Sequence, residues 1–165
     1  MDRSPRTPVV VLVGPKGAGK STLGRALEHA GFARFVDVES IFLALPDDQR
    51  TPEIGYRALL RELENEPRAA TIELTGAAPE ALELIEELRA RRPVRLIRVD
   101  APKDLCIERV KERDPAGHLP SDDALVAEVH RRSAALELNY DLAVDGAAPF
   151  DVPAIAIALR LDAPS

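Results

Sequence analysis

The feature that most constrains this sequence is a match to G-x-x-x-x-G-K-[ST], the phosphate-binding loop pattern, over residues 14–21. An apolar run over 9–13 precedes the loop and predicts a buried strand, while Leu23, Ala26 and Leu27 follow it at the spacing of one helix face. A loop held between a strand and a helix in this way can bind the phosphates of a nucleotide. The predicted nucleotide-binding residues are Gly14, Pro15, Lys16, Gly17, Ala18, Gly19, Lys20, Ser21 and Thr22.

The chemistry of this loop assigns roles to two of its side chains. Glycines let successive backbone N–H groups turn inward toward an anion, and the following helix adds the positive end of its dipole. Lys20 is expected to reach the β- and γ-phosphates as a catalytic residue, and the Ser21 hydroxyl is expected to bind Mg²⁺. ATP and Mg²⁺ are therefore the predicted cofactors.

Length and composition favour a single domain. The 165 residues allow one proper core, so residues 1–165 are interpreted as one domain whose polar start, 1–7, is expected to be disordered. A net charge of −6 and the lack of a Lys/Arg-rich block argue against a nucleic-acid surface, and no apolar stretch is long enough to span a membrane. With Cys106 as its only cysteine, the chain can form no internal disulfide, which favours a cytoplasmic protein.

Hydrophobic periodicity and chain breakers predict strands that alternate with helices. Expected strands cover 8–13, 32–38, 69–74, 94–99 and 140–144. Expected helices cover 21–30, 40–45, 52–64, 79–91, 102–113, 121–138 and 149–161, although the pattern over 154–159 also fits a strand. This alternation predicts an α/β fold with helices on both faces of a parallel sheet. Ligands are then expected at the carboxyl ends of the strands.

Three carboxylates lie near predicted strand ends. Asp37 and Glu39 close the second strand and point to the same side if the strand continues. Asp37 is the predicted catalytic base and a substrate residue, with water-mediated Mg²⁺ binding or helix capping as alternatives, and Glu39 is a second substrate candidate. Glu73 lies inside an apolar strand, where an unpaired carboxylate is unfavourable. It is predicted to contact substrate or to act as a Walker B-like acid near Mg²⁺, with a solvated edge position as the alternative.

Two arginines are candidates for stabilising charge during phosphoryl transfer. Arg109 and Arg113 lie four residues apart on one predicted helix face, just before a loop over 114–121 that contains proline and glycine. Arginine can bind a transferring phosphate through two parallel hydrogen bonds, so both are predicted catalytic residues. The alternative is that they form salt bridges with neighbouring glutamates on a solvated surface.

Taken in order, these features resemble the small P-loop kinases of the shikimate kinase, gluconate kinase and nucleoside/nucleotide kinase type. The resemblance covers residue 9 to about 145 and rests on the segments 14–21, 35–39, 94–102, 108–110 and 140–145. It implies a three-layer P-loop NTPase fold with a five-stranded parallel sheet in the order 2-3-1-4-5. It also implies use of ATP and Mg²⁺, a mobile lid over 114–121 and an acceptor-binding helical segment after the second strand.

The similarity to shikimate kinase is greatest at residues 41–42 and 55–57. In that light Asp37 holds and activates the acceptor hydroxyl, and Arg57 meets a carboxylate of the substrate. From the residues alone, a solvated position on the helix surface is the alternative for Arg57.

The sequence departs from that family at three places. Residues 73–77 read Glu-Leu-Thr-Gly-Ala where the family has a glycine triplet, and Leu60 stands where a glutamate is expected. The lid sequence over 114–120 lacks the arginine that the family places there. These departures do not affect the predicted ATP site, but they leave the identity of the acceptor undetermined. It could be shikimate, a nucleoside or nucleotide, or another hydroxylated metabolite.

The sequence therefore predicts an ATP- and Mg²⁺-dependent phosphotransferase that acts on a small-molecule acceptor. The expected partner is that acceptor, with no nucleic acid or membrane, and the protein is expected to be a monomer or homodimer. The alternatives are an NTPase or nucleotide-dependent switch without a small acceptor, and a nucleotide-binding protein without turnover. No Asn-Lys-x-Asp run that would specify guanine is present.

Overall fold

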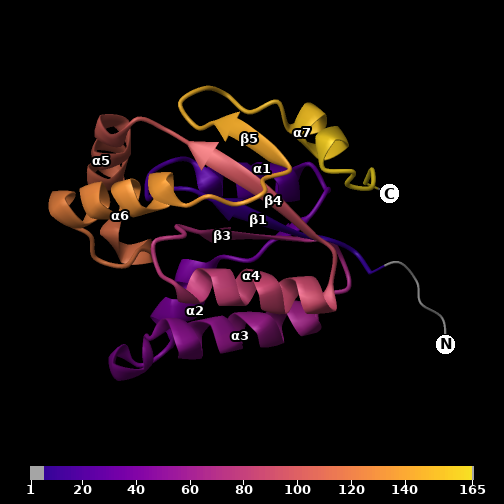
Figure 1. Ribbon diagram of the computed structural model, residues 1–165, viewed down its shortest axis with the longest axis horizontal. Coiled ribbons are helices and arrows are strands. Elements are labelled where there is room, and N and C mark those ends of the chain that lie inside the picture. The colour runs from indigo at the N-terminus through magenta and orange to yellow at the C-terminus, as the bar shows by residue number, and fades with distance from the viewer. Residues whose placement is uncertain (1–5, 165) are drawn as a thin grey trace.

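The fold is built on a parallel sheet with helices packed on both faces (Figure 1). The computed structural model describes residues 6–164. The strands in this part of the chain are β1 (Val9–Val13), β2 (Arg34–Phe35), β3 (Ala70–Leu74), β4 (Val94–Asp100) and β5 (Leu142–Asp145). The α-helices are α1 (Lys20–His29), α2 (Val38–Ala44), α3 (Pro52–Glu64), α4 (Glu80–Arg91), α5 (Lys103–Glu112), α6 (Asp123–Ala135) and α7 (Val152–Ala158), with 3-10 turns at Asp47–Gln49 and Pro115–Gly117.

The strand order is β2-β3-β1-β4-β5, and every described pair is parallel. This confirms the predicted α/β three-layer fold and its 2-3-1-4-5 sheet. Because β1 is central, all five of its residues are buried, and alternate side chains enter two cores. Val9, Val11 and Val13 pack with α3 and α4, while Val10 and Leu12 pack with α1, α5, α6 and α7.

Three predicted boundaries need correction. The strand expected over 32–38 is observed only as the two-residue β2, because Asp37 already caps helix α2. The helix expected over 121–138 is observed as α6 over Asp123–Ala135, and its cap is the Asp122 carboxylate, which accepts from Leu125 N. The alternating pattern at 154–159 falls mostly within helix α7 and not in a strand.

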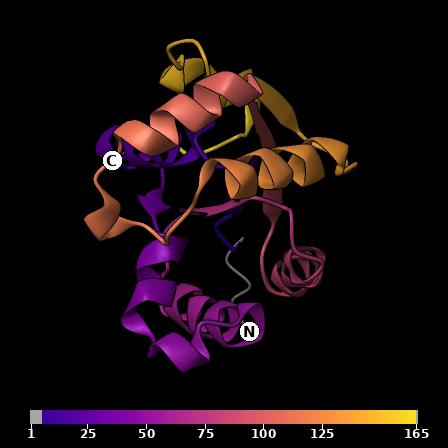
Figure 2. The ribbon, with the colours of Figure 1, turned by 90° about the vertical axis from the view of Figure 1, so that its left-hand side faces the viewer.

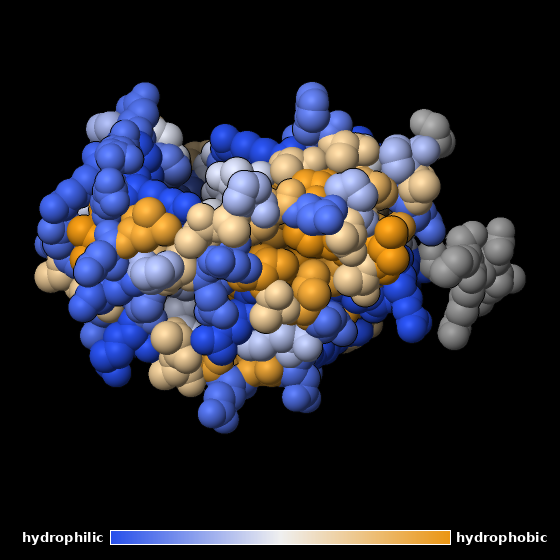
Figure 3. All heavy atoms as spheres, turned by 90° about the horizontal axis from the view of Figure 1, so that it is seen from above, coloured by the Kyte–Doolittle hydropathy of each residue, from blue (hydrophilic) through white to orange (hydrophobic). Residues whose placement is uncertain are grey.

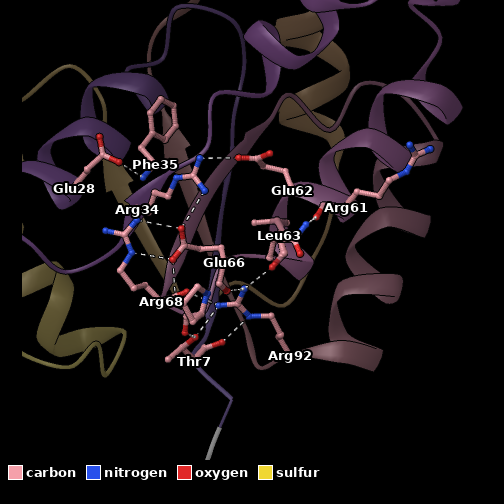
Figure 4. Close-up of polar contacts among 12 residues, drawn as sticks. Thr7, Glu28, Arg34, Phe35, Arg61, Glu62, Leu63, Glu66, Arg68 and Arg92 are labelled. Atoms are coloured by element: carbon pink, nitrogen blue, oxygen red, sulfur yellow. Dashed lines mark hydrogen bonds and ion pairs between the residues drawn. The ribbon is translucent and has the colours of Figure 1, made fainter.

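An ion-pair network around the buried Glu66 carboxylate lies at the amino end of the sheet (Figure 4). The Glu66 side chain is only 5% exposed and accepts hydrogen bonds from Arg68 Nε at 2.8 Å and Arg34 Nη1 at 3.0 Å. The bonds from Arg68, then from Arg34, hold the pKa of Glu66 at about 2. This network ties β2 to the turn before β3, at the end of the sheet remote from the phosphate-binding loop.

The start of the described chain is anchored at the same end. Arg92 donates from Nε to Thr7 O and from Nη2 to Thr7 Oγ1, each at 2.8 Å. The Thr7 hydroxyl also donates to Pro67 O at 2.8 Å. Thr7, at the end of the segment 1–7 predicted to be disordered, is thus held in place, and residues 1–5 lie outside the described part.

The face that carries β5 and α7 gathers apolar side chains among charged ones (Figure 3). Ile157 of α7 is the most exposed large apolar residue recorded in the described part, at 78%. Among residues 6–164, no helix is both long and apolar enough to cross a membrane.

Candidate active site

A cavity of about 610 Å³ opens at the carboxyl ends of β1 and β3, the end of the sheet seen in Figure 2. Its volume is in the range of small-molecule sites. The phosphate-binding loop forms one side, helices α2 and α3 form the other, and the segment between α5 and α6 lies across it. The lining residues are Lys16, Gly17, Gly19, Lys20, Ser21, Thr22, Arg25, Val38, Glu39, Phe42, Pro52, Tyr56, Glu73, Leu74, Thr75, Arg109, Arg113, His118 and Leu119.

The phosphate-binding loop has the backbone that its sequence predicts. Gly17 has a φ of 79°, and a Cβ there would lie 2.5 Å from the Cys106 carbonyl oxygen, so a larger residue would collide with α5. Helix α1 begins at Lys20 with Gly19 as its N-cap and no side-chain cap. The first amides of α1 therefore have no intrahelical acceptor and are free to bind an anion at the cavity.

Lys20 is buried at the floor of the cavity. Its ammonium donates to Pro15 O at 2.6 Å and Gly14 O at 2.7 Å, and its side chain lies under the loop. Burial lowers the pKa of Lys20 from 10.5 to about 8, against the opposing pull of the Glu73 charge. An anion bound in the loop would supply the negative charge that this buried ammonium lacks.

Ser21 and Glu73 meet across the β1–β3 pair. The Ser21 hydroxyl donates to Glu73 Oε2 at 2.7 Å, so the carboxylate near the end of β3 faces the loop and not a solvated edge. Burial raises the pKa of Glu73, while Lys20 and the Ser21 hydrogen bond oppose the shift. No group of three or more His, Cys, Asp or Glu residues that could hold a metal occurs among the described residues. The Ser21–Glu73 pair is thus a site at which phosphate oxygens would supply the remaining ligands of a hard cation such as Mg²⁺.

Asp37 and Glu39 do not lie together on a strand as predicted. Asp37 Oδ1 accepts from Ser40 N at 3.2 Å and caps α2, and Oδ2 lies 3.5 Å from Arg25 Nη2, so helix capping describes its observed contacts. Asp37 is not among the cavity-lining residues, whereas Glu39, in the first turn of α2, is. The chain turns into a helix after residue 37, so the period-two argument fails there.

The predicted lid lies against Glu39 and the phosphate-binding loop. Glu39 Oε2 accepts from Leu119 N at 2.9 Å, and Glu39 Oε1 lies 3.4 Å from His118 Nδ1. Lys16 Nζ donates to Ser121 Oγ at 3.0 Å. The segment predicted to be a lid is therefore held at the cavity by contacts with both α2 and the phosphate-binding loop.

The two arginines predicted for phosphoryl transfer line the cavity. Arg109 of α5 donates from Nη1 to Gly17 O at 3.2 Å, which places its guanidinium beside the loop. Arg113, the C-cap of α5, lines the cavity at the root of the lid. Its charge helps to lower the pKa of Lys16, after the larger effect of burial, so Arg113 and Lys16 share one region.

Arg57 is not brought to the cavity. Its guanidinium pairs with Glu53 at 2.9 Å along the exposed surface of α3, and its side chain is 58% exposed. Neighbouring Tyr56 faces the cavity instead. The solvated alternative considered for Arg57 is therefore the observed placement, because adjacent helix residues point about a quarter-turn or more apart.

The segments 41–42 and 55–57, which sequence similarity to shikimate kinase singled out, contribute Phe42 and Tyr56 to a wall of the cavity formed by α2 and α3, although neither residue was itself predicted as a site residue. Val38, Phe42, Pro52 and Tyr56 line the cavity here and are called the helical wall below. The Phe42 and Tyr56 rings meet edge to face, with centroids 5.8 Å apart and planes at 74°. A Cβ on Gly55 would lie 2.2 Å from Phe42 Cζ, so the glycine lets the Phe42 ring pack directly on α3.

Arg25, His118 and Leu119 also line the cavity without having been predicted. Arg25 follows Ser21 by four residues on α1, and that spacing was a usable signal because such residues share a helix face. The positions of the two lid residues depend on how the lid folds back, for which the sequence carries no comparable spacing rule.

Comparison with known proteins places the chain among P-loop proteins. A family model described as an AAA domain matches residues 9–136. No curated protein matches the sequence.

Solved structures of similar fold include three kinases. A sugar kinase from Janibacter sp. HTCC2649 has a TM-score of 0.65 and 18% identity, with 94% of this chain and 95% of that chain covered. A gluconokinase from Sinorhizobium meliloti 1021 has a TM-score of 0.61 and 21% identity, with 95% and 92% covered. The shikimate kinase from Aquifex aeolicus has a TM-score of 0.58 and 21% identity, with 92% and 96% covered. The chain belongs to the AAA domain family, and its fold is that of the small P-loop kinases.

Proposed function

We propose that the protein is an ATP- and Mg²⁺-dependent phosphotransferase that moves the γ-phosphoryl group to a hydroxyl or phosphate of a small molecule. The observation that carries this proposal is the lining of one cavity, which brings together the phosphate-binding loop, helices α2 and α3, and the segment between α5 and α6. We interpret the part beside α2 and α3 as a second compartment, which would hold the acceptor. An NTPase that transfers phosphoryl to water has no need of that second compartment. The similar sugar, gluconate and shikimate kinases support the same reaction class.

The loop side of the cavity is suited to bind the ATP phosphates. The free amides at the start of α1 and the buried Lys20 ammonium face the anion, while Arg109 and Arg113 bring further positive charge from α5. These charges are fixed before the reaction by packing and hydrogen bonds, so they need little rearrangement as charge moves in the transition state. In this position Arg109 and Arg113 neutralise the phosphoryl group as it transfers.

Ser21 and Glu73 are the residues that would hold Mg²⁺. The hydroxyl supplies an oxygen ligand, and Glu73 orients that hydroxyl and binds water on the ion. When bound there, Mg²⁺ would offset the negative charge that develops on the phosphate oxygens.

Glu39 is the carboxylate best placed to act on the acceptor. Asp37 caps α2 and does not line the cavity, and Glu73 is held by Ser21 beside the phosphate-binding loop. Glu39 lines the cavity next to the helical wall, where Leu119 N and His118 of the lid hold its carboxylate in place. A carboxylate there can accept the proton of an acceptor hydroxyl as the phosphoryl group arrives. Asp37 instead holds the start of α2, and thereby the direction of the Glu39 side chain.

A ligand screen tests the proposal. Thermal unfolding is measured across a metabolite library in the presence of Mg²⁺ and a non-hydrolysable ATP analogue, because a ligand that binds the folded state raises Tm. We expect the analogue to stabilise the protein, and one class of hydroxyl compound to stabilise it further only when the analogue is present. Lys20→Met should weaken analogue binding and so reduce both shifts. Stabilisation by nucleotide alone, with ATP turned over to inorganic phosphate at a rate that no compound changes, would contradict the proposal.

A further inference from the structure

Positive charge is unevenly distributed in the cavity. Within residues 6–164 the cavity is lined by five lysine and arginine side chains, namely Lys16, Lys20, Arg25, Arg109 and Arg113, and by His118. Four of them belong to the phosphate-binding loop or to the end of α5 beside it, where the ATP phosphates are proposed to bind. The helical wall contributes none, since it consists of Val38, Phe42, Pro52 and Tyr56.

The fifth basic side chain, Arg25, is already engaged elsewhere. Its guanidinium pairs with Asp37 at 3.5 Å and lies over the Phe35 ring, 5.7 Å from the ring centroid. The side chain is 65% exposed, so its charge faces solvent and Asp37. Arg57, the cation that sequence similarity assigned to a substrate carboxylate, pairs with Glu53 on the outer surface of α3.

Beside the helical wall the cavity is lined by neutral or negative side chains and by His118, whose Nδ1 lies 3.4 Å from Glu39 Oε1. Glu39 brings a carboxylate, and the floor beside it is Leu74 and Thr75 at the end of β3. Burial raises the pKa of Tyr56, so its hydroxyl remains a neutral hydrogen-bond donor at ordinary pH. A carboxylate or phosphate on an acceptor that packs on the helical wall would face Glu39, and the wall itself offers no cation to replace its hydration.

The rings of the helical wall offer apolar surface for the body of a ligand. Phe42 presses on Gly55, and Tyr56 meets it edge to face, so both rings are fixed by packing. Fixed aromatic surfaces bind flat or cyclic groups at a small entropic cost.

We infer that the acceptor is an uncharged alcohol with a ring that packs on Phe42 and Tyr56, its hydroxyl directed to Glu39. The inference rests on the proposed phosphotransferase function and narrows its substrate class. In the reaction the alcohol oxygen bonds to the γ-phosphorus of ATP, the bond from that phosphorus to the bridging oxygen breaks, and the hydroxyl proton passes to Glu39. The products are a phosphate monoester and ADP.

Matched pairs of acceptors test this inference on the full-length protein. The probes are benzyl alcohol with hydroxymethylbenzoate, cyclohexanediol with dihydroxycyclohexane carboxylate, and uridine with uridine monophosphate. ADP release is followed with saturating ATP and Mg²⁺, and the phosphorylated product is identified by mass spectrometry. We expect the neutral member of at least one pair to be phosphorylated with a kcat/KM at least about tenfold above that of its anionic partner, the factor that 1.4 kcal/mol produces.

Variants of the wall then identify the compartment. Tyr56→Phe removes the hydroxyl that would donate a hydrogen bond to the acceptor, and Phe42→Leu removes an aromatic contact. Each should raise the acceptor KM about two- to tenfold while the KM for ATP stays unchanged. Both substitutions keep an apolar side chain in place, so the wall stays packed. Arg57→Ala should leave the kinetics of both members of each pair unchanged, as should the matched control Arg61→Ala one turn further along α3.

The two proposals fail in different ways. Preference for the anionic members, or a selective loss of their turnover in Arg57→Ala, would overturn the neutral-acceptor inference and leave the phosphotransferase standing. Release of inorganic phosphate with no phosphorylated product from any probe would overturn both.

Discussion

Nucleotide binding should draw a proton onto Lys20. The ammonium is buried beneath the phosphate-binding loop, and burial lowers its pKa to about 8. The phosphates of ATP would place negative charge beside it and return the pKa toward or above its ordinary value of 10.5. Binding and protonation are then linked, so the proton taken up depends on pH.

The magnitude follows from the two pKa values. Without nucleotide, Lys20 is about 90% charged at pH 7, about half charged at pH 8 and about 10% charged at pH 9. Proton uptake on binding should therefore be about 0.1 at pH 7, about 0.5 at pH 8 and about 0.9 at pH 9, and affinity should fall about tenfold from pH 7 to pH 9. The lowered pKa of Lys20 also affects folding in the absence of nucleotide. Between pH 8 and 10.5 the unfolded chain keeps this proton while the folded protein loses it, so the free energy of unfolding rises with pH across that window.

Isothermal titration calorimetry measures this uptake directly. A non-hydrolysable ATP analogue with Mg²⁺ is titrated into the protein at pH 8 in buffers of different ionisation enthalpy, and the slope of the binding enthalpy gives the number of protons. Lys20→Met should abolish the main uptake, and Lys16→Met should remove a smaller share because burial also lowers the pKa of Lys16. Lys111→Met, on the exposed surface of α5, is the matched control and should leave the uptake intact. Equal uptake in the protein and in Lys20→Met would refute the reasoning.

Three further predictions test separate parts of the account. Glu39→Gln should lower kcat about 10²- to 10⁴-fold with little change in ATP affinity. Asp37→Asn, which preserves a good helix cap, should keep kcat within about threefold. Steady-state kinetics with an accepted alcohol show which carboxylate is the base, and a larger loss of kcat in Asp37→Asn would identify Asp37. Glu73→Gln leaves the Ser21 hydroxyl less firmly oriented. In a metal titration it should raise the Mg²⁺ concentration for half-maximal turnover about tenfold. An unchanged titration would rule out a role of Glu73 in Mg²⁺ binding. Glu66→Gln should lower the free energy of unfolding in urea by about 3 kcal/mol at pH 7. Because the folded pKa of Glu66 is about 2, its contribution is present above pH 4.5 and is lost as pH falls toward 2, so the difference between the two proteins should shrink across that window; a constant difference would be inconsistent with the pair.

The donor half of the site and the sheet could be predicted because their signals are local. The loop pattern, the apolar run of β1 and the helix spacing after it lie within about twenty residues and reinforce one another. The order of strands and helices along the chain could also be predicted, and this alternating order indicated a parallel sheet with helices on both faces. Lys20, Ser21, Arg109 and Arg113 line the cavity as those signals implied.

The acceptor half could not be predicted because it depends on where a helix begins and how it is turned. The chain leaves the extended conformation at Asp37, so Glu39 points from a helix and not from a strand. Helical spacing shows which residues share a face, but the face of α3 that meets the cavity is set by the packing of Phe42 on Gly55. That packing turns Tyr56 inward and leaves Arg57 outside.

The transfer of phosphate to an alcohol is the central claim, and ³¹P NMR tests it most directly. The protein is incubated with ATP, Mg²⁺ and the neutral cyclic alcohols described above, and the phosphorus-containing products are followed over time. The account predicts a phosphate monoester that grows in step with ADP, one for one, and that Lys20→Met does not produce. Inorganic phosphate as the sole product that accompanies ADP, or no conversion of ATP, would contradict it.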